Sequence, residues 1–249
     1  IGTPEDFTDE ERMFGQTAED FITKEVLPQI EEIDHQKEGL MPSLLKKAGE
    51  LGLLSVDVPE AYEGLGQTKT ASMYVAEKLS PSGSFGVGLM AHVGIGTLPI
   101  VFFGNEAQKK KYLPDLASGA KLAAYALTET GSGSDALAAK TKAVLTPDGK
   151  HYVLNGSKQF ITNAGTEISG CVTITAVTGD AGDRREISNL IVPNDTPGYE
   201  QGEPYRKMGW NASDTRPLSF EDCGVPEANL LGRRGDGFKN FLHILDGGR

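Results

Sequence analysis

The chain has 249 residues, of which 38% are hydrophobic and 24% are charged, and its formal net charge is −11. A chain of this length forms one large domain or two modest ones and can bury a sizeable core. The acidic balance argues against nucleic acid and anionic membrane surfaces as partners, because no excess of Lys and Arg is available to neutralise phosphates.

Several other classes of protein are also disfavoured. We find no apolar run of 18 residues, which predicts no integral membrane segment. Residues 1–7 show no secretory leader, although the chain does not begin with Met. Two cysteines, Cys171 and Cys223, are too few for a disulfide scaffold, and the four histidines are scattered. We therefore expect no metal site.

Helical periodicity dominates the first 120 residues. The pattern predicts a helix that begins with a capping box at Thr8 and Glu11. Further helices are expected from Pro42 to Gly52, over Thr70–Leu79, over the strongly apolar Phe85–Phe103, and from Asn105 until Pro114 and Gly119 end it.

After residue 120 the hydrophobic pattern has a period of two, typical of strands. The expected strands are Leu122–Leu127, Ala139–Leu145, Tyr152–Ile161, Cys171–Val177, Ile187–Val192 and Leu218–Phe220. Helical periodicity returns from Gly237. We predict an all-α helical domain (residues 1–120), an antiparallel β-barrel domain (121–234) and the start of a truncated C-terminal helical domain (235–249).

The segment from Tyr125 to Asp135 is rich in glycines and hydroxyls. Glycines let the backbone approach a ligand, and successive N–H groups form an anion-binding concavity. Thr128, Ser132 and Ser134 would add side-chain donors. The glycine spacing fits neither a P-loop nor a dinucleotide-binding fingerprint. An ordinary turn between strands explains the composition equally well.

Two further segments are candidates for a binding site. In 154–165, Asn155-Gly156 is typical of a hairpin turn, and Phe160 and Thr162 fall on one face of the following strand. This pairing suits a flat ring that needs stacking and a hydrogen-bond donor, but for this segment by itself a core Phe beside an edge Thr is the better interpretation. The segment 207–216, followed by 220–226, is explained as simply by a polar loop before an edge strand.

Taken in this order, the segments resemble the acyl-CoA dehydrogenase family. Residues 126–135 match its first signature, 155–163 are similar to its N-G-x-K-x-W-I-T-N segment, and 209–226 are similar to G-x-x-x-S-D-T-R and F-x-D-x-x-V-P. Gly235–Phe238 and Leu245–Arg249 resemble the start of its C-terminal helical domain. Residues 92–119 are most similar to the long- and very-long-chain members.

The resemblance implies an FAD-dependent enzyme that oxidises a fatty acyl-CoA to the trans-2-enoyl-CoA in β-oxidation. A glutamate would remove the α-proton, the β-hydrogen would leave as hydride to the flavin, and electrons would pass to an electron-transferring flavoprotein. It further implies a homotetramer or homodimer at full length, and a location in the bacterial cytoplasm or mitochondrial matrix.

The same resemblance assigns site residues. Those expected at the cofactor are Tyr125, Leu127, Thr128, Gly133, Ser134, Phe160, Ile161 and Thr162, and those expected at the substrate are Ser134, Asp246 and Arg249. Thr128 would donate to the pyrimidine edge of the flavin and Thr162 near its N5. Phe160 stands where the family usually has Trp, which loses an indole N–H.

No catalytic base is assigned within the chain. The resemblance places the catalytic Glu beyond Arg249, or in a few members at the position of Gly248, which cannot act as a base. Glu129 belongs to the first signature and is interpreted as structural. Two alternatives stay open: an oxygen-reactive acyl-CoA oxidase or monooxygenase of the same fold, favoured by Phe160, and a non-catalytic scaffold.

Overall fold

The computed structural model describes residues 6–181 and 184–248. Its α-helices are α1 (Asp9–Phe21), α2 (Ile30–Asp34), α3 (Leu40–Glu50), α4 (Lys69–Leu79), α5 (Gly83–Ala91), α6 (Leu98–Phe103), α7 (Glu106–Ala117) and α8 (Gly237–Gly248). The predicted capping box is formed, since the Glu11 N–H donates to Thr8 Oγ1 at 3.1 Å and the Thr8 N–H donates to the Glu11 carboxylate at 2.9 Å. Pro114 lies inside α7 and does not end it, contrary to the prediction.

The second half of the chain forms one sheet. Its strands are β1 (Leu122–Ala126), β2 (Lys142–Leu145), β3 (His151–Thr162), β4 (Ser169–Ala181), β5 (Arg184–Pro193), β6 (Tyr199–Gln201), β7 (Thr215–Pro226) and β8 (Leu230–Leu231). All six predicted strands are present. The short strands β6 and β8 were not predicted, because two or three residues are too few to show a period.

The predicted helical domain followed by a β domain is confirmed, but the antiparallel barrel is only loosely realised, because the sheet is not closed. The strand order is β6-β7-β3-β2-β4-β5-β8, and β1 pairs with β4 outside this path. Among the described residues the two end strands, β6 and β8, are not paired with each other. Most neighbours are antiparallel, but β1 and β2 each run parallel to β4. The sheet is therefore mixed and open along this path.

The Asn155-Gly156 pair is not a hairpin turn. Both residues lie within the continuous strand β3, where the pairing with β7 shifts register between Leu154 and Gly156. A Cβ on Gly156 would fall 2.7 Å from the Cα of Thr141 on the neighbouring segment. The glycine therefore allows close approach of two backbones at a β-bulge, a use of the same dipeptide that differs from the predicted turn.

One apolar helical stretch bears on the expectation of no integral membrane segment and is compatible with it. Gly83–Phe103, which comprises α5, a π-helical turn and α6, is long and apolar enough to cross a membrane by length and composition alone. Within its most apolar window, 67% is buried inside the protein. A Cβ on Gly96 would fall 2.3 Å from the carbonyl oxygen of Ala123, so β1 packs directly on this backbone. The stretch is packed into the core, in line with the strongly apolar helix predicted over Phe85–Phe103.

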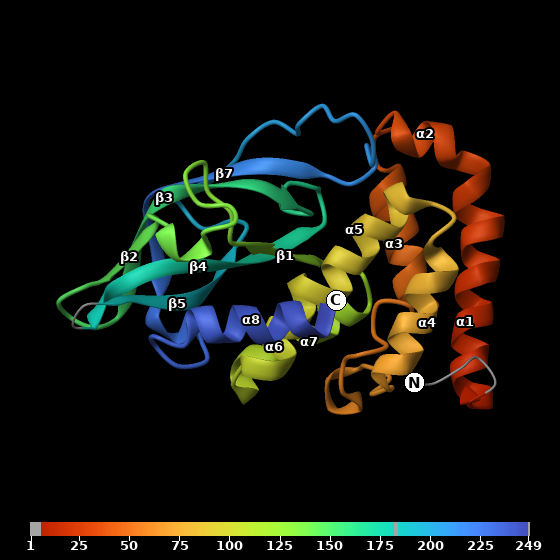
Figure 1. Ribbon diagram of the computed structural model, residues 1–249, viewed down its shortest axis with the longest axis horizontal. Coiled ribbons are helices and arrows are strands. Elements are labelled where there is room, and N and C mark those ends of the chain that lie inside the picture. Colours follow the sequence, from red (N-terminus) through yellow and green to blue (C-terminus); the bar gives the residue numbers. More distant parts are fainter. Residues whose placement is uncertain (1–5, 182–183, 249) are drawn as a thin grey trace.

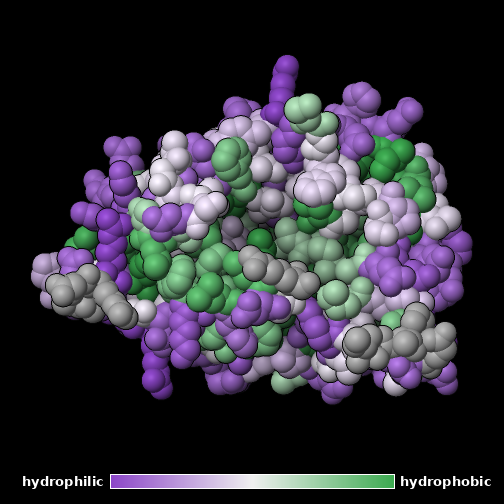
Figure 2. Space-filling model, viewed as in Figure 1, coloured by the Kyte–Doolittle hydropathy of each residue, from purple (hydrophilic) through white to green (hydrophobic). Residues whose placement is uncertain are grey.

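The helices and the sheet share a core. In Figure 1, helices α1–α4 occupy one end of the molecule and the sheet the other, with α5 and α6–α8 between them or against the sheet. One cluster of buried side chains contains Ile100 and Leu113 from the helices, Ala123 and Ile191 from the sheet, and Ile244 from α8. Hydrophobic residues also gather at the middle of the face shown in Figure 2. The site residues are thus held on one packed body.

A buried histidine ties the helical layer to the first strand. His92 is fully buried; its Nε2 donates to the Leu116 carbonyl at 3.0 Å, and its Nδ1 accepts from the Ala123 N–H at 3.1 Å. Both ring nitrogens are therefore satisfied only in the neutral Nε2–H tautomer. Burial lowers the pKa of His92 to about 4, because the charged ring would lose its hydration.

This histidine makes stability depend on pH. Between the ordinary His pKa and about 4, the unfolded chain binds a proton that the folded chain does not, so stability falls as the pH falls. Between pH 7 and pH 5, His92 should cost the parent about 2 kcal/mol in the free energy of unfolding. We expect the His92→Gln variant to lose less stability than the parent by this amount. Urea unfolding of both proteins at the two pH values measures this, and equal losses would contradict the assignment.

Candidate functional site

The loop that follows β1 folds back on itself. Glu129 and Ser132 exchange backbone hydrogen bonds of 3.0 and 3.1 Å, and the Ser132 hydroxyl donates to the Asp135 carbonyl at 2.7 Å. Gly133 and Ser134 are exposed on this loop. A Cβ on Gly133 would meet no described atom within 4 Å. The packing of this chain does not require a glycine here, so the open backbone is available to a ligand.

A buried ion pair supports this loop from beneath. Lys158 on β3 is fully buried, and its ammonium donates to the Glu129 carboxylate at 2.9 Å, to the Leu127 carbonyl at 3.0 Å and to the Thr175 hydroxyl at 3.3 Å. The other contacts of the Glu129 carboxylate are with the N–H groups of Lys140 at 2.6 Å and of the next residue at 3.1 Å. The loop is thereby held against β3.

The environment of Glu129 keeps it ionised. Burial raises its pKa, but the Lys140 N–H and the Lys158 ammonium outweigh burial, so the pKa lies below its usual value. A base that abstracts a weakly acidic proton needs a raised pKa and a free oxygen. Glu129 has neither, which supports its interpretation as structural.

The loop and β3 together present two hydroxyls and an aromatic ring. The Thr128 carbonyl accepts from the Gln159 N–H at 2.8 Å, which places the loop beside the end of β3. Phe160 is 62% exposed, and its backbone φ of 61° lies in the left-handed region at a bulge between Lys158 and Ile161. The hydroxyls of Thr128 and Thr162 make no hydrogen bond to the described residues. Their donors are free for a ligand.

The structure separates the other predicted residues from this exposed group. Tyr125 is buried, with its ring stacked on Phe241 of α8 at 5.9 Å and its hydroxyl 3.5 Å from the Asn189 side chain. Ile161 points into the sheet core, and the Leu127 carbonyl is occupied by the lysine beneath it. These three residues support the surface, and their side chains do not form it.

The predicted substrate residues lie on different parts of the chain. Ser134 is on the exposed loop, whereas Asp246 is exposed on the last turn of α8. Arg249 lies outside the described residues. Their predicted roles stay predictions.

The candidate segment 207–216 supports the end of β3. Asp214 accepts from Arg216 Nε at 2.6 Å and from the Gly165 N–H at 3.0 Å, and its backbone carbonyl accepts from the Asn163 N–H at 2.9 Å. The Asn163 amide in turn donates to the carbonyl of Gly88 on α5 at 2.7 Å. These bonds fix the strand end that carries the free Thr162 hydroxyl.

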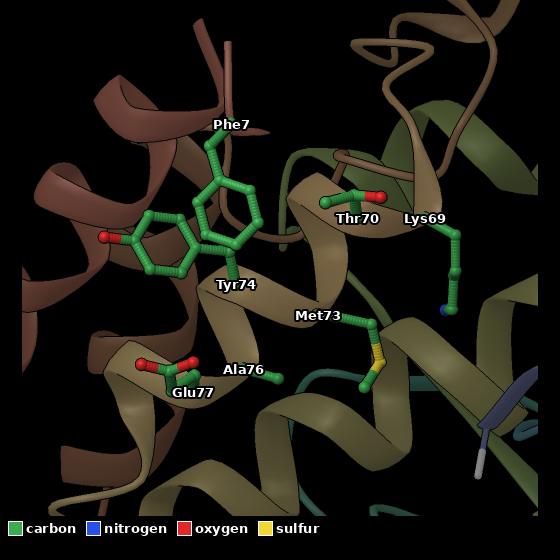
Figure 3. A pocket seen from close by; sticks show the side chains of 7 residues that line it. All are labelled: Phe7, Lys69, Thr70, Met73, Tyr74, Ala76 and Glu77. Carbon is green, nitrogen blue, oxygen red and sulfur yellow. The ribbon is translucent and has the colours of Figure 1, made fainter. Parts of the chain in front are cut away.

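Another depression lies away from these residues. It is lined by Phe7 and by side chains of α4 that include Met73 and Tyr74, and it contains none of the predicted site residues (Figure 3). Phe7 and Tyr74 lie with ring centroids 4.6 Å apart at its edge. It is a feature of the helical layer and not of the surface formed by the loop and β3.

Comparison with known proteins identifies the fold family. Residues 8–120 match the N-terminal domain of acyl-CoA dehydrogenases, and residues 124–223 match their middle domain. The chain belongs to the acyl-CoA dehydrogenase family. A probable acyl-CoA dehydrogenase of Bacillus subtilis is 53% identical over 247 residues, which cover 99% of the chain and 41% of that protein.

Solved structures of the family have the same fold. An acyl-CoA dehydrogenase complexed with FAD from Bacillus anthracis superposes with a TM-score of 0.94 at 51% identity, covering 100% of this chain and 42% of that one. The butyryl-CoA dehydrogenase of Megasphaera elsdenii gives a TM-score of 0.90 at 35% identity, covering 100% and 64%. The chain thus spans from two fifths to about two thirds of the length of these relatives. The butyryl enzyme is named for a short acyl chain, so the expected similarity to long-chain members stays a prediction.

Lys158 is the family residue whose role the sequence did not reveal. In the sequence it is only one position of the motif at 155–163. In the structure it is the cation that pairs with Glu129 and holds the loop after β1. A usable signal was present, because by alternation Lys158 falls on the same strand face as Tyr152 and Leu154, and a buried lysine is rarely tolerated without a partner.

The support at the end of β3 yields a stability prediction. A Cβ at Gly165 would fall 2.3 Å from Arg216 Cδ and Nε, so Gly165→Ala must displace the guanidinium from Asp214. We expect a loss of about 1–3 kcal/mol in the free energy of unfolding. Gly209→Ala, where a Cβ meets nothing within 4 Å, is the matched control and should change stability by less than about 0.5 kcal/mol. Urea unfolding of both variants tests this, and equal stabilities would contradict it.

Proposed function

We propose that the chain is part of an FAD-dependent acyl-CoA dehydrogenase that oxidises an acyl-CoA to the trans-2-enoyl-CoA in fatty acid β-oxidation. The observation that carries this proposal is the exposed group of Phe160 with the unpaired hydroxyls of Thr128 and Thr162. A flavin needs an apolar cover for its ring and donors for its heteroatoms, and this group offers both.

The residues present fit FAD. Thr128 and Thr162 would donate to the ring, Phe160 would shield it from water, and the open backbone at Gly133 with the exposed Ser134 would receive the polar part of the cofactor or the acyl-CoA. When bound, FAD supplies the acceptor for the β-hydrogen. The protein's own part is to orient the ring, hold it dry and keep the loop fixed through Lys158.

The proposal also includes the electron acceptor, the oligomeric state, the catalytic base and the cellular compartment. We expect electrons to pass to an electron-transferring flavoprotein and the full-length protein to be a homotetramer or homodimer. The base would be a Glu beyond Arg249. Both cysteines, Cys171 and Cys223, are buried and free, which agrees with a reducing compartment such as the bacterial cytoplasm or the mitochondrial matrix.

The cofactor contacts are testable by themselves. Thr128→Val and Thr162→Val each remove one donor without changing side-chain volume much, and each should weaken FAD binding about tenfold, the equivalent of one hydrogen bond. Thr70→Val, an exposed threonine on α4, is the control and should leave the affinity unchanged. Titration calorimetry with FAD measures all three, and parent-like affinity in both site variants would contradict the contacts.

The activity is tested by anaerobic visible spectroscopy of the FAD-loaded full-length protein, which includes the residues beyond Arg249. Bleaching of the flavin bands on addition of butyryl-CoA or palmitoyl-CoA, with enoyl-CoA formed, is the expected result, and the better substrate of the two tests the long-chain expectation. Flavin that is bound but bleached by neither thioester would contradict dehydrogenation and favour a scaffold role.

A second candidate is an oxygen-reactive enzyme of the same fold, such as an acyl-CoA oxidase or a monooxygenase. The exposed Phe160, in place of the usual Trp, gives the ring a smaller cover, and this observation favours the alternative. Stoichiometric oxygen uptake during turnover would support it, whereas turnover that requires an electron acceptor other than oxygen would support the dehydrogenase.

A further inference from the structure

The buried Lys158 ammonium has one contact that does more than balance charge. Besides Glu129 and Thr175, it donates to the carbonyl of Leu127 at 3.0 Å. An ammonium offers three donors, so its hydrogen-bonding capacity is fully used. Since Lys158 is fully buried, this charged hydrogen bond is not weakened by competing water.

The Leu127 carbonyl belongs to the same peptide unit as the Thr128 N–H. That N–H makes no hydrogen bond to the described residues, while the Thr128 carbonyl is held by the Gln159 N–H at 2.8 Å. A cation on the oxygen of an amide withdraws electron density from its nitrogen and makes the N–H a stronger donor. Thr128 therefore presents a fixed, polarised N–H beside its free hydroxyl.

We propose that Lys158 is a positioning residue for the flavin, which orients and polarises the Thr128 amide through the Leu127 carbonyl and so makes the bound cofactor easier to reduce. This inference rests on the proposed function. Reduction adds negative charge to the ring, and a preorganised donor that faces this charge stabilises the reduced form more than the oxidised form. Glu129 serves this arrangement by holding the ammonium in place.

The test replaces the ion pair as a unit. The double variant Glu129→Gln with Lys158→Met leaves no unpaired buried charge, so it is expected to fold and bind FAD. We expect the equilibrium between oxidised and reduced flavin to shift at least tenfold toward the oxidised form, which is about 30 mV for a two-electron couple. Midpoint potentials of the FAD-loaded proteins, measured against reference dyes, report the shift.

An exposed ion pair supplies the matched control. Asp20→Asn with Lys24→Met removes the same kinds of charge from the surface of the helical layer, where the pair is more than half exposed on the lysine side. Its potential should equal that of the parent. A merely structural role of Lys158 predicts weaker FAD binding or lower stability without a change in potential, so a shift below threefold in the FAD-bound double variant would overturn the proposal.

Two further measurements test the proposal if the double variant does not fold. Glu129→Asp keeps the charge but draws the ammonium away from Leu127, so it should shift the potential in the same direction by a smaller factor; no shift or an opposite one would overturn the proposal. In the cofactor-free protein, the amide proton of Thr128 should also move upfield on Glu129→Asp in NMR spectra, and an unchanged resonance would count against a polarised N–H.

The two levels of the proposal fail differently. If the full-length parent takes up no FAD, the proposed function fails, and the role of Lys158 toward a flavin falls with it. If the parent binds and reduces FAD but the variants keep its potential, the function stands and only the assignment of Lys158 is overturned.

Discussion

A charge pair buried under the loop that follows β1 is the constraint on which the candidate site depends. An ammonium and a carboxylate without water must find all their partners within the protein, or the fold loses several kcal/mol. Lys158 and Glu129 satisfy this only when the loop turns back over β3, because, apart from the Thr175 hydroxyl, the remaining partners are backbone groups of Leu127, Lys140 and Thr141. The loop conformation is thus a consequence of solvating two buried charges.

Further hydrogen bonds connect the second half of the chain to the helical layer. His92 joins the carboxyl end of α7 to β1, and Asn163 joins the end of β3 to α5. Ser84 on α5 similarly accepts the Ala212 N–H and donates to Asp34 on α2. Each hydrogen bond is directional, whereas the shared apolar core is not. These hydrogen bonds therefore fix the segments that carry Thr128 and Thr162 relative to the helices. Apolar packing alone would define their positions less sharply.

The motif residues divide into those left accessible to a ligand and those whose polar groups are used within the protein. Phe160 and the loop glycine Gly133 are exposed and Thr162 is half-buried with a free hydroxyl, while Glu129, Lys158 and Asp214 are engaged within the protein. This division explains why the third segment, with its charged pair, looked like a ligand site in sequence. Its charged side chains, Asp214 and Arg216, bond to each other and to the end of β3, so Asp214 is not free to contact a ligand.

Much of the architecture was readable from local pattern. The capping box at Thr8, the change of period near residue 120 and the six longer strands were all predicted, because capping and side-chain alternation depend on neighbours in sequence. The bulge at Gly156 was mistaken for a turn, since the dipeptide permits both and only the partner strand decides between them. The open, mixed sheet likewise depends on which distant strands pair.

The sequence by itself determined the family, the two kinds of layer and the residues available for a flavin, because these follow from motif chemistry and periodicity. Only the tertiary structure decided which of those residues have free donors: Thr128 and Thr162 do, while Tyr125 is turned toward α8. It also decided that Lys158 contacts the loop that carries Thr128. The physical reason is that a buried charge is defined by partners distant in sequence, and no local pattern states which carbonyl a lysine will reach.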